Sequence, residues 1–269
     1  MSTAATTGPA GRPTWAQVVL PTEHGGWGLT AEPALMGLLV APSVAGLCLS
    51  LAAVVAFMAR TPLKVVLVDR RRGRHLPRTQ AAARVLAGEL AAVGTLGVAT
   101  AATTGSQGWW WPLVAAAPLV LTELWFDVRS RGRRLVPEVA GAGGVATVAA
   151  TVALLGGTGA RLAVALWAVQ TARVATSVPF VRDQVARIHH RPPAPETVRA
   201  GNLTALALTC AAVAVALPVL AGAVAVVAVV GVQMITGGGD PPTAKVLGVR
   251  QTLLGLAVVA GTAAGVHLW

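Results

Sequence analysis

Residues 135–155 read LVPEVAGAGGVATVAATVALL. After Glu138 this stretch holds no ionisable side chain, and its length matches the ~20 residues that an α-helix needs to cross the hydrocarbon of a bilayer. Alanine, glycine and valine make up most of it, and such small side chains let helices approach one another closely inside a membrane. The stretch therefore predicts a transmembrane helix packed among other helices.

The rest of the chain has the same character. Of its 269 residues, 55% are hydrophobic and only 12% are charged, which is about half the charged fraction of a soluble domain. The mean hydropathy is +0.68. We predict an all-α fold, a polytopic membrane bundle of about nine transmembrane helices, with residues 22–269 forming one domain. Residues 1–21 are rich in Thr, Ala, Pro and Gly and are predicted to form a disordered cytoplasmic tail.

Apolar runs and the residues that interrupt them define the predicted spans. They cover residues 27–40, 44–68, 81–103, 109–127, 135–155, 162–181, 198–217, 219–235 and 247–268. Pro62 lies inside the second span, and Pro218 separates the seventh span from the eighth. Only Pro42 separates the first two spans, which could also form one broken hairpin. An even count would place one basic loop on the wrong side of the membrane, so nine spans are predicted.

Basic residues gather in alternate loops. The loops after even-numbered spans carry Arg70, Arg71, Arg72, Arg74, Arg78, Arg129, Arg131, Arg133, Arg134, Arg182, Arg187, Arg191 and Lys245. The loops after odd-numbered spans carry only Arg161. The positive-inside rule then predicts a multi-pass protein of the cell membrane, with its N-terminus in the cytoplasm and its C-terminus outside. This distribution accounts for the net charge of +11, so no nucleic-acid partner is expected.

A charge that faces lipid at mid-depth costs roughly 3 kcal/mol or more. An ionisable side chain inside a span therefore needs a structural or functional reason, and such residues are the candidate functional residues. Arg60 and Lys64 are four residues apart and share one helix face, as do Glu123 and Asp127. Arg173 lies deep in the sixth span. We expect these side chains to face the interior of the bundle.

Two interpretations of these charges stay open. In the first, they form ion pairs that hold the bundle together, for example Arg173 with Glu89 or Glu123. In the second, Arg60, Lys64 and Arg173 line a basic cavity that opens to the cytoplasm and binds an anionic head group such as a diphosphate.

The first span opens with the sequence EHGGW. We expect Glu23, His24 and Trp27 to cover the mouth of the cavity, because Gly25 and Gly26 allow the backbone to approach closely. The alternative is that Trp27 anchors the helix among lipid head groups.

Other chemistry has little support. The five histidines show no spacing typical of metal ligands, and no metal site is predicted. Residues 237–239 are all glycine, but no strand precedes them and no Lys-Ser/Thr follows, so they do not form a phosphate-binding loop.

Three short segments near the two ends of the chain are distinctive: EHGGWG at 23–28, EPALMG at 32–37 and PTAKVLGVRQ at 242–251. In these segments the chain resembles the YwiC-like membrane proteins, a family of unclear function.

A wider resemblance rests on the sequence WFDVRSRGRRLVPEVAG at 125–141. This segment is similar to the basic turn between helices four and five of the UbiA-type intramembrane prenyltransferases. The resemblance implies nine helices and a cavity, open to the cytoplasm, for an isoprenoid substrate. Those enzymes hold magnesium with aspartates four residues apart after spans two and six, where this chain has only Asp69 and Asp183. The cofactor is therefore unknown, and the missing pairs argue against magnesium.

Two function hypotheses follow. The first is a UbiA-like enzyme, or a descendant of one, that acts on or binds a membrane lipid such as an isoprenoid or a quinone. The second is a non-enzymatic membrane protein, either a small-solute permease or an accessory subunit. Many transporters contain internal repeats, and the lack of a convincing repeat here favours the first. Catalytic residues and oligomeric state are left open. The candidate substrate-binding residues are Glu23, His24, Trp27, Arg60, Lys64, Asp69, Glu123, Asp127, Arg173 and Asp183.

The charge distribution makes a topology prediction. Residues 70–79, 129–134 and 182–196 are expected to be cytoplasmic. Single cysteines at Gly73, Gly132 and Ala194, in a background lacking Cys48 and Cys210, should therefore react with a membrane-impermeant reagent only after the cytoplasmic side is exposed. Labelling of any of the three from outside intact cells would contradict the nine-span topology.

Overall fold

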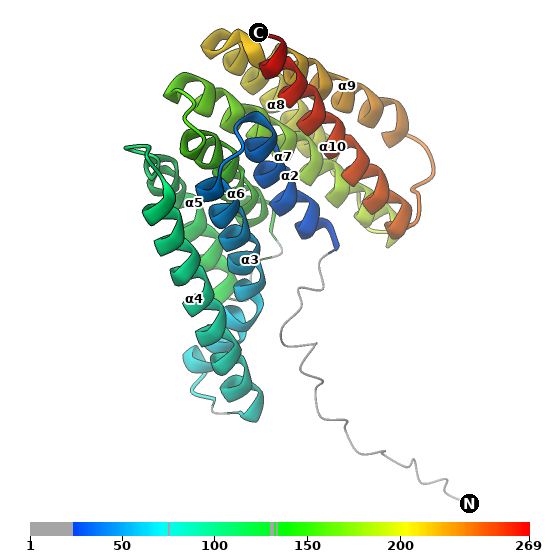
Figure 1. The fold of residues 1–269 in the computed structure, drawn as a ribbon. Coiled ribbons are helices and arrows are strands. Elements are labelled where there is room, and N and C mark those ends of the chain that lie inside the picture. The colour runs from blue at the N-terminus through cyan, green and yellow to red at the C-terminus, as the bar shows by residue number, and fades with distance from the viewer. Residues whose placement is uncertain (1–23, 75, 130–131, 133) are drawn as a thin grey trace, which may run out of the picture.

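The fold is entirely helical where the structure, a computed structural model, describes it. The description covers residues 24–74, 76–129, 132 and 134–269, with the backbone alone for residues 24–26. Over these ranges the chain forms nine α-helices, one short 3-10 helix and no strand (Figure 1). The all-α prediction is confirmed. The predicted tail, residues 1–21, lies outside the described residues.

The helices are, in chain order, α2 (His24–Val40), α3 (Val44–Arg71), α4 (Pro77–Thr103), α5 (Trp111–Val128), α6 (Leu135–Leu155), α7 (Ala160–Ile188), α8 (Pro195–Val215), η1 (Leu217–Val219), α9 (Leu220–Gly237) and α10 (Ala244–Leu268). The last eight α-helices, with η1 joined to α9, are long and apolar enough to cross a membrane. The remaining helix, α2, has a shorter apolar part, Trp27–Val40. The protein is therefore a multi-pass membrane protein with a helical bundle, as predicted.

Several helices extend beyond the predicted spans. Arg70 and Arg71 form the last turn of α3 instead of a loop, and α7 continues to Ile188. Pro62 does not interrupt α3, since a membrane helix tolerates a proline when neighbouring groups satisfy the freed backbone. Pro218 does end the preceding helix, and it lies in η1.

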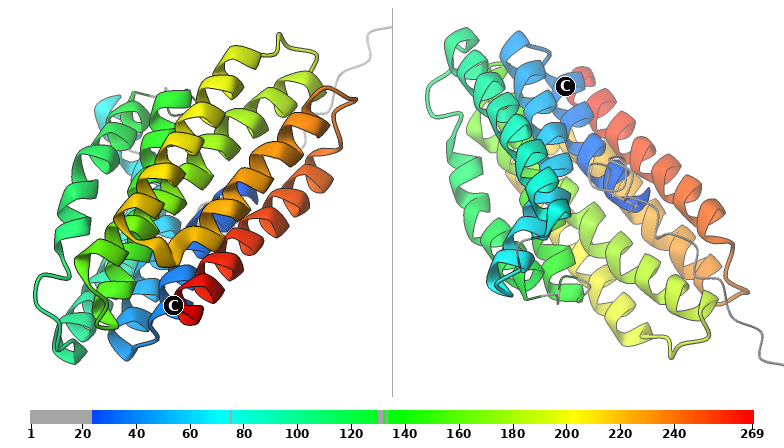
Figure 2. Two further views of the ribbon diagram at one scale, coloured as in Figure 1. Left: turned by 90° about the horizontal axis from the view of Figure 1, so that it is seen from above. Right: turned by 90° about the horizontal axis from the view of Figure 1, so that it is seen from below.

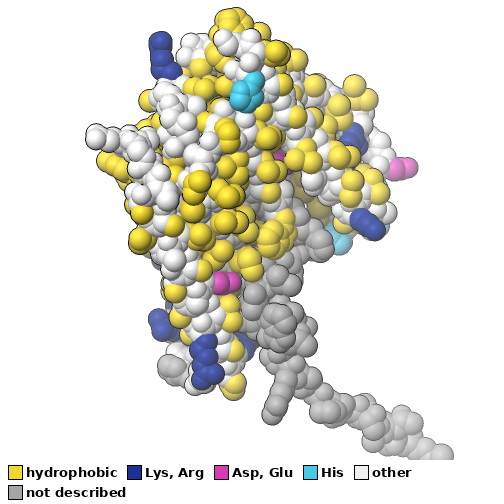
Figure 3. All heavy atoms as spheres, in the orientation of Figure 1, with side chains coloured by type: hydrophobic (Ala, Val, Ile, Leu, Met, Phe, Trp, Pro, Cys, Tyr) yellow, Lys and Arg dark blue, Asp and Glu magenta, His cyan; other side chains and the backbone are white. Residues whose placement is uncertain are grey.

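Successive helices run back and forth, so the connections after α3, α5, α7 and α9 lie at one end of the bundle (Figure 1). We call this the basic end, because its exposed residues include Arg70, Arg72, Arg134, Arg191 and Lys245. In Figure 3 one broad face is mainly hydrophobic, and Lys and Arg side chains gather at the lower tip of the α3–α4 hairpin.

The centre of the bundle is formed by α6 and α7. These are the two most buried of the eight long helices, and the largest core cluster joins them to α2, α8, α9 and α10. In contrast, α4 packs against α3 alone among the described helices and lies at the edge of the bundle (Figure 2). Although α4 and α5 are consecutive in sequence, they do not pack against each other.

The contact between α2 and α6 requires a glycine at position 37. A Cβ atom at Gly37 would lie 2.6 Å from the Cβ of Val152 and 3.0 Å from the carbonyl oxygen of Ala149. No real side chain tolerates that separation from a rigid helix, so an added methyl group must push α2 away from α6.

Gly37→Ala is therefore expected to destabilise the bundle by about 1–3 kcal/mol, the usual cost of overpacking. Gly88→Ala in α4 is the matched control, because nothing lies within 4 Å of an added Cβ there. Thermal denaturation of the purified proteins in detergent measures both. Equal melting temperatures for the two variants would contradict the close approach of α2 and α6.

Candidate functional site: a charge-balanced cavity inside the bundle

A cavity of about 840 Å³ lies between seven of the helices. Its lining residues come from α2, α3, α4, α5, α6, α7 and α10, whereas α8 and α9 contribute none. Most of the lining is apolar. The wall formed by α4 consists of Leu86, Leu90 and Val93, and the facing part of α5 includes Val120 and Leu124.

The ionisable residues of the lining nearly balance in charge. They are Arg60, Arg173 and Arg182 on the positive side, and Glu32, Glu123, Asp127 and Glu138 on the negative side. The predicted basic cavity is therefore wrong in its charge. Positive residues dominate the loops of this sequence, but carboxylates from neighbouring helices accompany the arginines that reach the cavity.

One group of charges joins α3 to α5, and we call it the Arg60 cluster. The Arg60 guanidinium lies 2.7 Å from Glu123 and 3.1 Å from Asp127, whose other carboxylate oxygen is 3.1 Å from the Lys64 ammonium. The four-residue spacing on each helix produces this arrangement, because it places both members of each pair on one face. Lys64 itself does not line the cavity.

A second group, the Arg173 cluster, joins α7 to α2 and α10 at mid-depth. Arg173 Nε lies 3.5 Å from Glu32 Oε2. Its two terminal nitrogens donate hydrogen bonds to Gln251, at 3.2 Å to the side-chain oxygen and 2.7 Å to the backbone carbonyl. Arg173 therefore has Glu32 as its acidic partner, and the suggested pairs with Glu89 or Glu123 are wrong.

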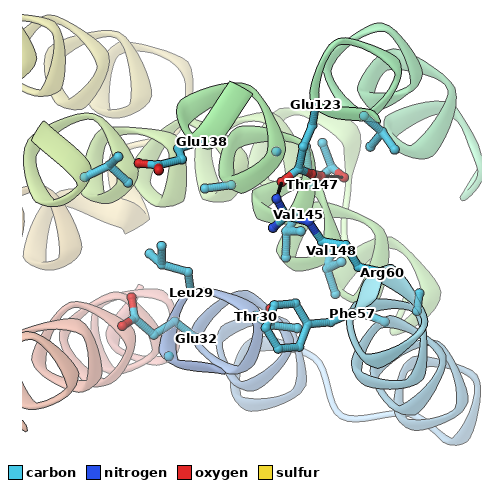
Figure 4. A pocket seen from close by; sticks show the side chains of 18 of the residues that line it. Leu29, Thr30, Glu32, Phe57, Arg60, Glu123, Glu138, Val145, Thr147 and Val148 are labelled. Carbon is cyan, nitrogen blue, oxygen red and sulfur yellow. Dashed lines mark hydrogen bonds and ion pairs between the residues drawn. The ribbon is translucent and has the colours of Figure 1, made fainter. Parts of the chain in front are cut away.

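Figure 4 shows how these groups surround the cavity. Arg60 and Glu123 point toward each other on one side, and Glu32 lies on α2 across the cavity from them. Glu138 lies farther along the wall, where Arg182 Nη1 donates to it at 2.7 Å. This third pair is partly exposed and belongs to the turns of α6 and α7 nearest the basic end.

Each carboxylate of the two clusters lies against a glycine. A Cβ added at Gly255 would occupy the place of the Glu32 carboxylate, and one at Gly141 that of Glu123. A Cβ added at Gly132 would likewise occupy the place of the Asp127 carboxylate. Gly132 is also buried, so the exposed Arg134 is a better labelling position in the α5–α6 connection.

The other candidate residues lie outside the cavity lining. The Asp69 carboxylate accepts hydrogen bonds from Thr79 and Arg78, and so holds the start of α4 against the end of α3. Asp183 accepts from the backbone N–H of Ala194 at 2.7 Å and pairs with Arg187, which holds the α7–α8 connection. The structure therefore does not bring Asp69 or Asp183 to the cavity, because their carboxylates instead hold the helix ends around the α3–α4 and α7–α8 connections.

The predicted cover of the cavity mouth is described only in part. Glu23 and the side chain of His24 lie outside the described residues. Trp27 is exposed and packs edge-to-face on Phe57 with ring centroids 5.2 Å apart, and Phe57 lines the cavity. Trp27 itself is not among the lining residues.

Sequence reasoning missed Glu32 and Gln251 as site residues. The signal for Glu32 was its depth, since it lies eight residues into α2, or about 12 Å from the start of that helix. A carboxylate at mid-depth needs a partner at a similar depth, and Arg173 near the middle of α7 is that partner.

Within the described part of the chain, no three His, Cys, Asp or Glu side chains lie close enough together to hold a metal ion. The chemistry available to the lining is hydrogen bonding and charge pairing, next to apolar walls.

Asp127→Asn tests the Arg60 cluster. The Asp127 side chain is only 2% exposed and balances two cations, so its neutralisation is expected to destabilise the protein by about 2 kcal/mol. This is less than the cost of breaking a fully buried pair, because the Lys64 side chain is 40% exposed and can be hydrated. Asp240→Asn, at an exposed loop position, is the control. If both variants melt at the wild-type temperature in detergent, Asp127 does not hold α3 to α5.

The comparison with known proteins agrees with the first resemblance. A family model described as YwiC-like protein matches residues 20–153, which include α2 to α5 and nearly all of α6. Neither a curated protein nor a solved structure matches the chain. The segment 242–251 lies beyond the matched residues, and the UbiA-like fold stays a prediction. Over residues 20–153, the chain is similar to the YwiC-like family.

Proposed function

We propose that this membrane protein binds an amphiphilic lipid, of the isoprenoid or quinone type, inside its helical bundle. The observation that carries the proposal is the cavity of about 840 Å³, with long apolar walls and internally paired charges. Cavities of this size bind drug-sized ligands in other proteins, mostly through apolar contacts with a few polar groups that fix the orientation.

The apolar part of the lining suits a hydrocarbon tail. Leu86, Leu90 and Val93 on α4 face the cavity, and so do Val120 and Leu124 on α5. Leu90 and Val120 are both about half exposed, and α4 does not pack against α5. We infer that a tail lies along this wall and reaches the bilayer between α4 and α5.

The polar part suits a head group without excess charge. The guanidinium groups of Arg60 and Arg173 already face carboxylates, so a diphosphate would have to displace an acidic partner. A head group that forms hydrogen bonds without bringing a net charge leaves those pairs intact. The distant UbiA-type resemblance supports an isoprenoid as the tail, and the positive-inside rule supports a mouth near Glu138 and Arg182 that faces the cytoplasm.

A variant that fills the cavity tests this function. Ala56 on α3 lines the cavity and is exposed within it, so Ala56→Phe is expected to occupy the space of the tail. Ala91→Phe is the matched control, because Ala91 is exposed on α4 but does not line the cavity. Lipids extracted from each purified protein are identified and quantified by mass spectrometry.

The wild type and the Ala91 variant should retain an isoprenoid lipid that is enriched over the membrane extract, and the Ala56 variant should lose it several-fold. Elution as a single peak in gel filtration confirms that each variant is folded. Equal enrichment in all three proteins, or bulk phospholipid alone in the wild type, would overturn the proposal.

A further inference from the structure

The geometry points to a hydroxyl-binding site at Glu32, Arg173 and Gln251, which takes the alcohol or phenol group of a neutral lipid. This inference rests on the proposed lipid binding and names the class of head group. It concerns the Arg173 cluster alone, at mid-depth in the cavity.

The first support is a set of buried polar atoms that lack hydrogen-bond partners. Glu32 is 3% exposed and Arg173 is 1% exposed, and all three residues of the site line the cavity. Within the described residues, Glu32 Oε2, Arg173 Nε and Gln251 Nε2 have no hydrogen-bond partner. Such atoms cost about 1–3 kcal/mol each when buried, so a bound group that satisfies them is favoured.

The second support is the spacing of two of these atoms. Arg173 Nε and Glu32 Oε2 are 3.5 Å apart, which exceeds the usual N–H···O distance of about 2.9 Å. An oxygen atom placed about 2.8 Å from each would bridge the two atoms. A hydroxyl group can serve as this bridge, because it accepts from the Arg173 N–H and donates to the Glu32 carboxylate at the same time. The Gln251 amide offers a further N–H.

The third support is the charge of the pair. Glu32 and Arg173 together are neutral, and little water reaches them. An anionic group placed there would face the Glu32 carboxylate without a free cation to balance it. An ether or ester oxygen would accept from Arg173 but would leave Glu32 Oε2 without a donor. Of these oxygen groups, a hydroxyl alone satisfies both atoms and adds no charge.

Three probes that share the same farnesyl tail distinguish a hydroxyl, an ether and an anionic head group. Tritium-labelled farnesol, farnesyl methyl ether and farnesyl diphosphate are each titrated against the full-length protein in nanodiscs, with empty nanodiscs as the background. In the wild type, farnesol is expected to bind about tenfold more tightly than its methyl ether, because the hydroxyl makes one additional hydrogen bond to a charged group. Farnesyl diphosphate is expected to bind more weakly than farnesol.

Variants of the site residues test whether the preference for farnesol over its ether arises at this site. Gln251→Leu should weaken the binding of farnesol and of its methyl ether to a similar extent, because either oxygen can accept from the Gln251 amide, while the backbone carbonyl of residue 251 still holds Arg173. The double variant Glu32→Gln with Arg173→Gln removes both charges together, leaves no buried charge unpaired, and should bring the preference close to one. Gln170→Leu is the control, because Gln170 lies one turn from Arg173 without lining the cavity.

Each outcome decides a separate point. If farnesol and its ether bind the wild type equally well, the cavity binds tails but the hydroxyl site is wrong. If the diphosphate binds most tightly, the site binds anionic head groups and the inference is overturned. If no probe binds above the empty nanodiscs, the proposed lipid binding fails and the hydroxyl site fails with it. An unchanged preference in the double variant would place the hydroxyl elsewhere.

Discussion

The arrangement of this bundle depends on the pairing of charges between helices. A cation inside a membrane protein needs a carboxylate, a ligand or water, because neither lipid nor apolar side chains can solvate it. Here each arginine of the cavity lining meets a carboxylate from another helix. Arg60 joins α3 to α5, Arg173 joins α7 to α2, and Arg182 joins α7 to α6. The same contacts that neutralise the charges therefore position the walls of the cavity.

Packing and charge pairing are coupled through glycines. The carboxylates of Glu32 and Glu123 occupy volumes that side chains at Gly255 and Gly141 would fill. Small residues in membrane helices are usually explained by close backbone approach, which Gly37 illustrates at the contact between α2 and α6. At the cavity they serve a second purpose, since they leave room for an acidic group from the neighbouring helix. A substitution at such a glycine would alter the electrostatics of the site as well as its packing.

The charge balance of its lining also distinguishes this cavity from a diphosphate-binding site. Such a site needs cations or metal ions in excess, whereas the described lining residues here hold three arginines and four carboxylates. The YwiC-like match covers α2 to α5 and nearly all of α6, and it contains the whole Arg60 cluster and Glu32. Arg173 and Gln251 lie beyond the matched residues, so the wall formed by α7 and α10 completes the site from the other half of the chain.

The sequence by itself determined the features that depend on local periodicity. Long apolar runs predicted the helices, and the four-residue spacings of Arg60 with Lys64 and of Glu123 with Asp127 predicted two shared faces. Only the tertiary structure decided which faces meet. It paired Arg173 with Glu32, placed Asp69 and Asp183 in contacts at the helix ends outside the cavity, and showed a charge-balanced cavity instead of a basic one. The physical reason is that helical periodicity fixes the direction of a side chain around its own axis. The neighbour in that direction depends on how distant helices pack, and packing of small side chains in lipid leaves little trace in the sequence of either helix.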